Sequence, residues 1–249
     1  MGAIAVALGI LGFSAAGSAA SADVVHVAVA TNFAATCRQV ADAFTSALQH
    51  EVLLSEGSTG KLAAQIANGA PFEVFLSGDA ERPRRLEDNH HAVAGTRFSY
   101  ALGRLVLWSA RDGFVRDETV LRGDDFAHLA IANPDLAPYG AAAREALQHL
   151  GVWERVLPKL VRGEDVGQTF HFVSTGNAEL GFVALSQLGG AGGSRWLVPS
   201  KLHAPIEQQA VLLAAGQDDP AAKAFLAFLS SATARGLIER AGYGVPSPP

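Results

Sequence analysis

Short apolar runs alternate with segments of helical periodicity from residue 23 onward. The first run, residues 24–30, is rich in valine and predicts a strand. Apolar residues then recur at i, i+4, i+7, i+11 and i+15, which predicts one stripe of an amphipathic helix. This stripe consists of Phe33, Cys37, Val40, Phe44 and Leu48. Strands that alternate with helices along the chain predict an α/β fold.

The same patterns place the remaining elements. Further strands are predicted at residues 52–55, 74–76, 105–108, 129–132, 160–161, 180–185 and 210–214. Helices are predicted around Leu62 and Ile66, at 141–150 and at 168–174. Two more helices follow the last strand, and Asp219 before Pro220 is the expected N-cap of the first.

The first 22 residues contain no Asp, Glu, Lys or Arg. An apolar core at residues 3–13 is followed by small residues that end in Ala20-Ser21-Ala22, which is typical of a secretory signal peptide cleaved after Ala22. A membrane anchor is the alternative, but glycine and serine interrupt the stretch, and a spanning helix needs about 20 strongly apolar residues. We therefore expect an exported mature chain that does not span the membrane, although no basic residue precedes the apolar core.

Composition and charge exclude several classes of protein. The chain carries 19 Lys and Arg against 24 Asp and Glu, a formal net charge of −5, and 49% of its 249 residues are hydrophobic. So much apolar material excludes a disordered acidic chain, and the acidic balance argues against a nucleic-acid partner. Because Cys37 is the single cysteine, an internal disulfide and a cysteine-rich metal centre are excluded.

Four loops that open predicted helices are rich in hydroxyl groups and glycine. They are Thr31-Asn32, residues 57–62, residues 138–140 and residues 163–167. A helix N-terminus carries unpaired N–H groups and the positive end of the helix dipole, so it binds anions without a basic side chain. Ordinary helix capping is the alternative for each loop taken alone. An anion site requires that the loops converge across a cleft, which the sequence does not show.

No motif for catalysis is present in the sequence. Gly60-Lys61 is followed by leucine, so the stretch is not a phosphate-binding P-loop, and Glu56 stands where a serine-hydrolase elbow needs glycine. The eight histidines are scattered without metal-ligand spacing. We find no nucleophile paired with a base and therefore expect a protein that is not an enzyme.

The chain resembles the periplasmic molybdate-binding proteins (ModA) of ABC importers across nearly all of residues 23–246. The matching stretches are residues 27–33, 57–62, 65–77, 131–134, 137–140, 143–147, 163–166 and 179–183. The resemblance implies the type II periplasmic binding protein fold, with two α/β lobes and a ligand cleft between them. By the same resemblance, residues 23–102 and 204–249 would form the first lobe and residues 103–203 the second.

The resemblance also implies a set of ligand contacts. Carried over by position, the molybdate-binding residues would be Thr31, Asn32, Ser58, Thr59, Tyr139 and Val166, with Val166 contributing a backbone N–H. Some members of the family use a tyrosine where this chain has Ala184, and others use one at the position of Tyr139. We therefore expect the tyrosine hydroxyl to come from Tyr139. These groups would contact the oxygens of the oxyanion and would not ligate the metal directly.

The function implied is the capture of molybdate, with tungstate as a second ligand, and its delivery to an ABC permease. We expect a monomer in the periplasm, with no cofactor beyond the oxyanion ligand. Two alternatives stay open: a binding protein for another oxyanion or small anionic solute in the same fold, and a secreted enzyme on this scaffold. Because none of the four loops contains an arginine, a small carboxylate is the less favoured ligand.

Overall fold

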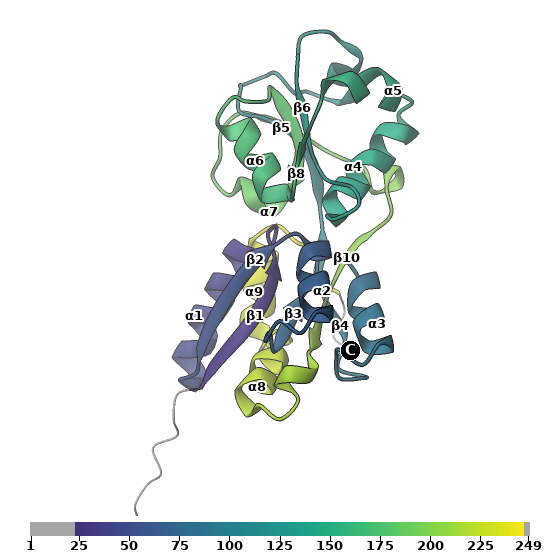
Figure 1. Cartoon of the computed structure of the whole chain (residues 1–249). Helices are drawn as coiled ribbons and strands as arrows, with labels where there is room; N and C mark the ends of the chain where they lie inside the picture. The colour runs from purple at the N-terminus through teal and green to yellow at the C-terminus, as the bar shows by residue number, and fades with distance from the viewer. Residues whose placement is uncertain (1–22, 247–249) are drawn as a thin grey trace, which may run out of the picture.

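The computed structural model describes residues 23–246, so the predicted signal peptide at residues 1–22 lies outside the described residues. The described chain forms two lobes, each built on its own five-stranded sheet (Figure 1). We call lobe I the sheet β2-β1-β3-β10-β4 with the helices packed on it, and lobe II the sheet β7-β6-β8-β5-β9 with its helices. No helix of residues 23–246 is long and apolar enough to cross a membrane.

Lobe I packs helices on both faces of its sheet. Its strands are β1 (Val24–Ala30), β2 (Glu51–Gly57), β3 (Val74–Leu76), β4 (Phe98–Gly103) and β10 (Ile206–Leu212). Its helices are α1 (Ala34–Leu48), α2 (Thr59–Ala67), α3 (Glu81–Asp88), α8 (Pro220–Phe228) and α9 (Ala232–Arg240). Strand β1 pairs in parallel with β2 and β3, and β10 is antiparallel to β3 and β4. Because side chains alternate along a strand, Val27 of β1 packs with α1, α8 and α9, whereas Ala28 packs with α2 and α3.

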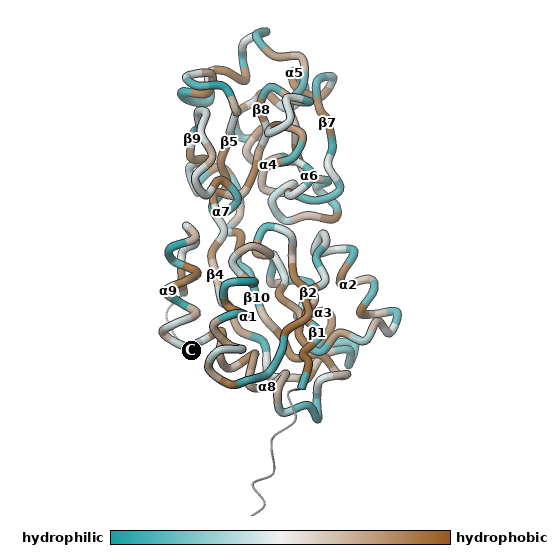
Figure 2. The backbone as a smooth tube through the Cα atoms, turned by 90° about the vertical axis from the view of Figure 1, so that its left-hand side faces the viewer, coloured by the Kyte–Doolittle hydropathy of each residue, from teal (hydrophilic) through white to brown (hydrophobic). Residues whose placement is uncertain are grey.

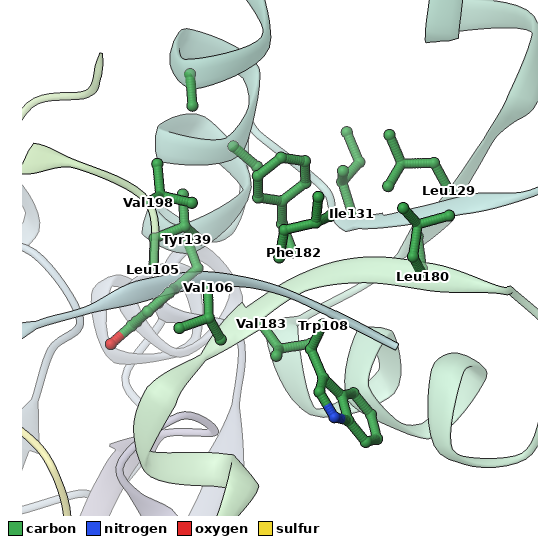
Figure 3. Packing of buried hydrophobic residues seen from close by; sticks show 14 of the residues in the cluster. Leu105, Val106, Trp108, Leu129, Ile131, Tyr139, Leu180, Phe182, Val183 and Val198 are labelled. Carbon is green, nitrogen blue, oxygen red and sulfur yellow. The ribbon is translucent and has the colours of Figure 1, made fainter. Parts of the chain in front are cut away.

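Lobe II has the same layered construction. Its strands are β5 (Leu105–Ser109), β6 (Leu129–Ala132), β7 (Leu160–Gly163), β8 (Leu180–Ala184) and β9 (Ser194–Leu197). Its helices are α4 (Pro138–His149), α5 (Trp153–Val156), α6 (Val166–Ser174) and α7 (Leu185–Leu188). Strand β6 is parallel to β7 and β8, and β5 is antiparallel to β8 and β9. Figure 3 shows Leu129, Ile131 and Phe182 in its core, and in Figure 2 the central strands of both lobes are mostly apolar.

The chain passes between the lobes twice, and the two passages lie side by side. Arg104 alone separates β4 from β5, and residues 203–205 precede β10. Gly103 is paired with Ile206 in the antiparallel ladder of β4 and β10. The lobe boundaries predicted from the sequence fall at these same two passages, and their exact positions remain a prediction.

Most of the predicted elements are present, and three of the predicted strands, at 24–30, 74–76 and 129–132, have the observed bounds. Asp219 caps α8 as predicted, because its carboxylate accepts hydrogen bonds from the backbone N–H groups of Ala221 and Ala222. The strand predicted at 210–214 is wrong at both ends, since β10 starts at Ile206 and a 3₁₀ turn begins at Ala214. Leu48 is also wrong as a member of the buried stripe, because it ends α1 and is 45% exposed.

The sequence patterns do not predict five elements: β4, β9, α3 and the short helices α5 and α7. Helix α3 has the sequence ERPRRLED, in which Leu86 is the one large apolar side chain, so no helical stripe is visible. Strand β9 is a short edge strand whose residues are alternately half-buried and exposed. Helix α3 and strand β9 therefore depend on packing against neighbouring elements, because neither has a strong hydrophobic pattern of its own.

Candidate anion-binding site

The four helix-opening loops meet at one small cavity between the lobes. Lobe I lines it with residues 30–32 and 57–59, and lobe II lines it with residues 137–139 and 165–166. All six residues predicted from the sequence lie on its wall: Thr31, Asn32, Ser58, Thr59, Tyr139 and Val166. The structure therefore supplies the convergence that the sequence alone did not show.

Backbone N–H groups at the starts of three helices are available at this cavity. Within residues 23–246, the N–H groups of Asn32, Ser58 and Val166 donate to no protein acceptor. They stand at the entrances of α1, α2 and α6, and α4 opens with Pro138 on the same wall. Helix dipoles point their positive ends at these positions, so the cavity favours negative charge although the chain as a whole is acidic.

Two lobe I hydroxyls are fixed as acceptors by the backbone. Ser58 is the N-cap of α2, and its Oγ accepts a hydrogen bond from the Lys61 N–H at 3.4 Å. Thr59 Oγ1 accepts one from the Gly78 N–H at 3.2 Å. Both side chains are buried. Because the backbone N–H groups occupy a lone pair on each oxygen, each O–H proton is left for an acceptor in the cavity.

The third lobe I hydroxyl has no partner at all. Thr31 Oγ1 is buried, and in the described part of the chain it is the single buried side-chain polar atom without a hydrogen bond. A buried hydroxyl left unsatisfied costs about 1–3 kcal/mol, so native proteins rarely contain one. On the cavity wall, this hydroxyl is available as a hydrogen-bond donor.

Tyr139 carries the hydroxyl of lobe II. Its ring is buried in the lobe II core, and the hydroxyl points away from that cluster (Figure 3). Gly103 makes room for it, since a Cβ at this position would lie 2.4 Å from the hydroxyl oxygen. Burial raises the pKa of Tyr139 well above its usual value, so the hydroxyl stays protonated and can donate. At the alternative position, Ala184 is buried at the end of β8 and offers no hydroxyl.

The side chain of Asn32 does not serve the cavity as a donor. Its Nδ2 donates to Gln208 Oε1 at 2.9 Å and to the Tyr243 hydroxyl at 3.2 Å, which uses both of its N–H groups. Asn32 can therefore contribute only its backbone N–H. The sequence reading placed Asn32 at the site and missed Gln208, because the predicted strand started two residues later.

Charged side chains around the cavity are occupied elsewhere. The Asp165 carboxylate on the wall caps α6 and accepts from the Gln168 N–H at 2.9 Å. Lys61 forms an ion pair with Glu164 of the other lobe. Within residues 23–246, no cluster of three or more His, Cys, Asp or Glu side chains is placed to hold a metal ion. The wall thus offers neutral hydrogen-bond donors.

The lobes touch each other around this cavity. The Gly60 N–H donates to the Leu136 carbonyl at 2.9 Å, and Arg82 Nη2 donates to the Asp135 carbonyl at 2.8 Å. Gly167 at the start of α6 packs against Thr31, since a Cβ on Gly167 would lie 2.4 Å from Thr31 Cγ2. The two halves of the donor set are therefore held face to face.

A family model described as bacterial extracellular solute-binding protein matches residues 25–244. The chain belongs to this family. It is 49% identical over 240 residues to the molybdate-binding protein ModA of Azotobacter vinelandii, covering 94% of this chain and 95% of that protein. It is 48% identical over 225 residues to ModA of Rhodobacter capsulatus, covering 90% and 89%. These relatives confirm the resemblance found in the sequence, and they are named as binding proteins rather than as enzymes.

Solved structures agree with this assignment. The periplasmic molybdate-binding protein of Azotobacter vinelandii superposes with a TM-score of 0.87 at 40% identity. The match covers 90% of this chain and 100% of that chain. The sulfate-binding protein SubI of Mycobacterium tuberculosis has a TM-score of 0.78 at 15% identity, which shows a shared fold. The predicted type II periplasmic binding protein fold is confirmed.

Proposed function

We propose that this protein captures molybdate, and tungstate as its analogue, in the cavity between the lobes and delivers it to an ABC permease. The observation that carries the proposal is the unpartnered buried hydroxyl of Thr31 on the cavity wall. The relatives at 49% and 48% identity, both named molybdate-binding proteins, support the identity of the ligand. The proposed contacts are Thr31, Asn32, Ser58, Thr59, Tyr139 and Val166.

The chemistry of the wall fits such an anion. Molybdate is a dianion that carries no proton at neutral pH, so each contact to it must be a hydrogen-bond donor. The cavity offers the hydroxyls of Thr31, Ser58 and Tyr139 together with backbone N–H groups, while the Asp165 carboxylate is held by the α6 cap. Hydrogen bonds to a charged group contribute about 1.5–3 kcal/mol each. Molybdenum is the cargo here, held through its oxygens.

The fixed positions of the helix starts would select the ligand by its size. Helix termini cannot shift toward a smaller anion to restore their hydrogen bonds, so sulfate would lose contacts that molybdate makes. Tungstate is nearly the same size as molybdate and would bind alike. Binding of another oxyanion in the same fold is the alternative function.

The setting of this activity is part of the proposal. We infer that the mature chain works in the periplasm as a monomer after cleavage near Ala22, and that the permease of the importer receives its ligand. Support comes from the extracellular solute-binding family and from the uncharged first 22 residues. No nucleic acid and no cofactor enters this scheme.

Isothermal titration calorimetry tests the proposal on the mature chain, residues 23–249. Molybdate, tungstate, sulfate and hydrogen phosphate are titrated separately. We expect one tight site for molybdate and for tungstate, much weaker binding of sulfate and none of phosphate. Failure to bind molybdate would contradict the proposal, and equal affinity for sulfate would favour the alternative.

A further inference from the structure

A buried chain of hydrogen bonds joins the two lobes behind the cavity. Tyr243, Asn32, Gln208 and Tyr139 are its members, and each is at least nine-tenths buried. Gln208 stands at its centre on β10, the strand that follows one of the passages between the lobes. Its side chain is fully buried and is not among the residues that line the cavity.

The donor–acceptor direction of these hydrogen bonds is fixed at the end where Tyr243 lies. The Tyr243 hydroxyl oxygen lies 2.6 Å from the Asn32 carbonyl oxygen, and a carbonyl can only accept, so the Tyr243 proton lies between the two. The Tyr243 oxygen then has only lone pairs to offer to the Asn32 amide, 3.2 Å away. The Nδ2 end of Asn32 must therefore face Tyr243.

The same order of donors and acceptors continues through Gln208 to Tyr139. Asn32 Nδ2 also donates to Gln208 Oε1 at 2.9 Å, and the Tyr100 hydroxyl lies 3.0 Å from the same oxygen. With its oxygen turned to the Asn32 amide, Gln208 points its Nε2 at the Tyr139 hydroxyl oxygen, 3.4 Å away. The backbone N–H of Arg104 also faces that oxygen. Two donors thus face the lone pairs of Tyr139, and its own proton is directed away from them.

We propose that Gln208 is a positioning residue that fixes Tyr139 as a hydrogen-bond donor toward the cavity, and so restricts the site to oxyanions that carry no proton. A protonated oxyanion such as hydrogen phosphate needs one acceptor in its site. Tyr139 is a poor acceptor for the ligand while the N–H groups of Gln208 and Arg104 face its lone pairs. This inference rests on the proposed binding of molybdate.

The substitution Gln208→Glu tests the proposal because it changes the proton order without changing the shape. An ionised carboxylate has only acceptors, so it would accept a hydrogen bond from the Tyr139 hydroxyl. A lone pair of Tyr139 and an added negative charge would then face the anion. We expect molybdate affinity at about pH 8 to fall by about 100-fold or more. At lower pH the introduced carboxyl group becomes protonated, its O–H donates to Tyr139 and its carbonyl accepts from Asn32, which restores the original order.

The decisive readout is therefore the pH dependence of molybdate binding by calorimetry. Between about pH 8 and pH 5.5 we expect the Gln208→Glu variant to regain about tenfold or more in affinity, because burial raises the pKa of a carboxyl group into this range. The wild-type affinity should stay flat. Burial raises the pKa of each neighbouring group, Tyr100, Tyr139, Tyr243 and Cys37, so none of these titrates in the window. Asp79, whose charge also raises the pKa of Tyr100, is ion-paired with Arg82.

Two further variants separate this role from a structural one. Gln208→Met removes the hydrogen bonds without adding charge, and we expect a pH-independent loss of about tenfold. Gln209→Glu is the matched control, because it makes the same change one residue along the strand, where the side chain bonds to Arg97 and Ser99 instead. Its affinity should equal that of the wild type at every pH.

The outcomes are distinguishable. The proposal is supported if molybdate affinity recovers at low pH in Gln208→Glu and in no other variant. An affinity of Gln208→Glu equal to the wild type, or a loss that acid does not reverse and that Gln208→Met reproduces in full, overturns it. If Gln208→Glu does not fold, a wild-type affinity in Gln208→Met overturns the proposal and a loss of about tenfold supports it. Failure of the wild-type protein to bind molybdate would instead contradict the proposed function.

Discussion

The two lobes hold their share of the donors by different means. In lobe I the hydroxyls are on short side chains at helix starts, and the backbone N–H groups of Lys61 and Gly78 fix Ser58 and Thr59. In lobe II the hydroxyl of Tyr139 is at the end of a long side chain, positioned by Gly103 and by Gln208 from the strands that join the lobes. The lobe I hydroxyls are therefore positioned mainly by residues near them in the sequence. The Tyr139 hydroxyl is positioned by residues far from it in the sequence.

The largest effect is expected from the lobe II donor itself. Tyr139→Phe keeps the buried ring and removes the hydroxyl, so molybdate binding should weaken by about 1.5–3 kcal/mol, the range for a hydrogen bond to a charged group. Calorimetry on the folded variant measures this loss. An unchanged affinity would mean that the hydroxyl does not face the anion.

The lobe I donor without a partner should show opposite effects on stability and binding. Thr31→Val removes a buried unsatisfied hydroxyl, so the ligand-free protein should gain about 1 kcal/mol in free energy of unfolding while molybdate binding weakens by about 1.5 kcal/mol. Urea unfolding and calorimetry measure the two quantities. Thr31→Ser, which keeps the hydroxyl, is the control and should bind nearly as well as the wild type. Loss of both stability and affinity in Thr31→Val would contradict the account.

The contact between the lobes can be tested at Gly167. In Gly167→Ala the new methyl group would overlap Thr31 Cγ2, which separates the two halves of the donor set. We expect molybdate binding to weaken by about 1 kcal/mol or more, because the methyl group must displace Thr31. Gly190→Ala, in a loop with open space around it, is the matched control. Equal affinities for the two variants would show that this contact is not needed.

The smallest effect is expected from the ion pair between the lobes. Lys61 and Glu164 have side chains that are 53% and 45% exposed, so solvent screens their attraction. Lys61→Met should change molybdate affinity by less than about 1 kcal/mol, and less still at high salt. A loss of about tenfold would assign the binding to a basic side chain instead of the neutral donors.

The same contrast explains what could be predicted from the sequence. The helix starts of lobe I carry local signals, so the loops with Thr31, Ser58 and Thr59 are predicted from their positions after strands. The resemblance to the family then assigns these residues to the ligand. The convergence of the four loops depends on how the two sheets pack, which no local pattern records. Gln208 was missed because its polar neighbours Glu207 and Gln209 hid the start of β10. Gly103 carries no sequence signal, and Gly167 is predicted only as part of a helix-opening loop, since the role of both is the space they leave for a partner from elsewhere in the chain.

The most direct test of the central claim is a crystal structure of the mature protein with tungstate, located by its anomalous scattering. The account predicts one strong anomalous peak in the cavity between the lobes. Oxygens of the anion should lie within hydrogen-bond distance of Thr31 Oγ1, Ser58 Oγ, the Tyr139 hydroxyl and the Val166 N–H. A peak outside this cavity, or an anion in it that leaves Thr31 Oγ1 and the Tyr139 hydroxyl without contact, would contradict the account.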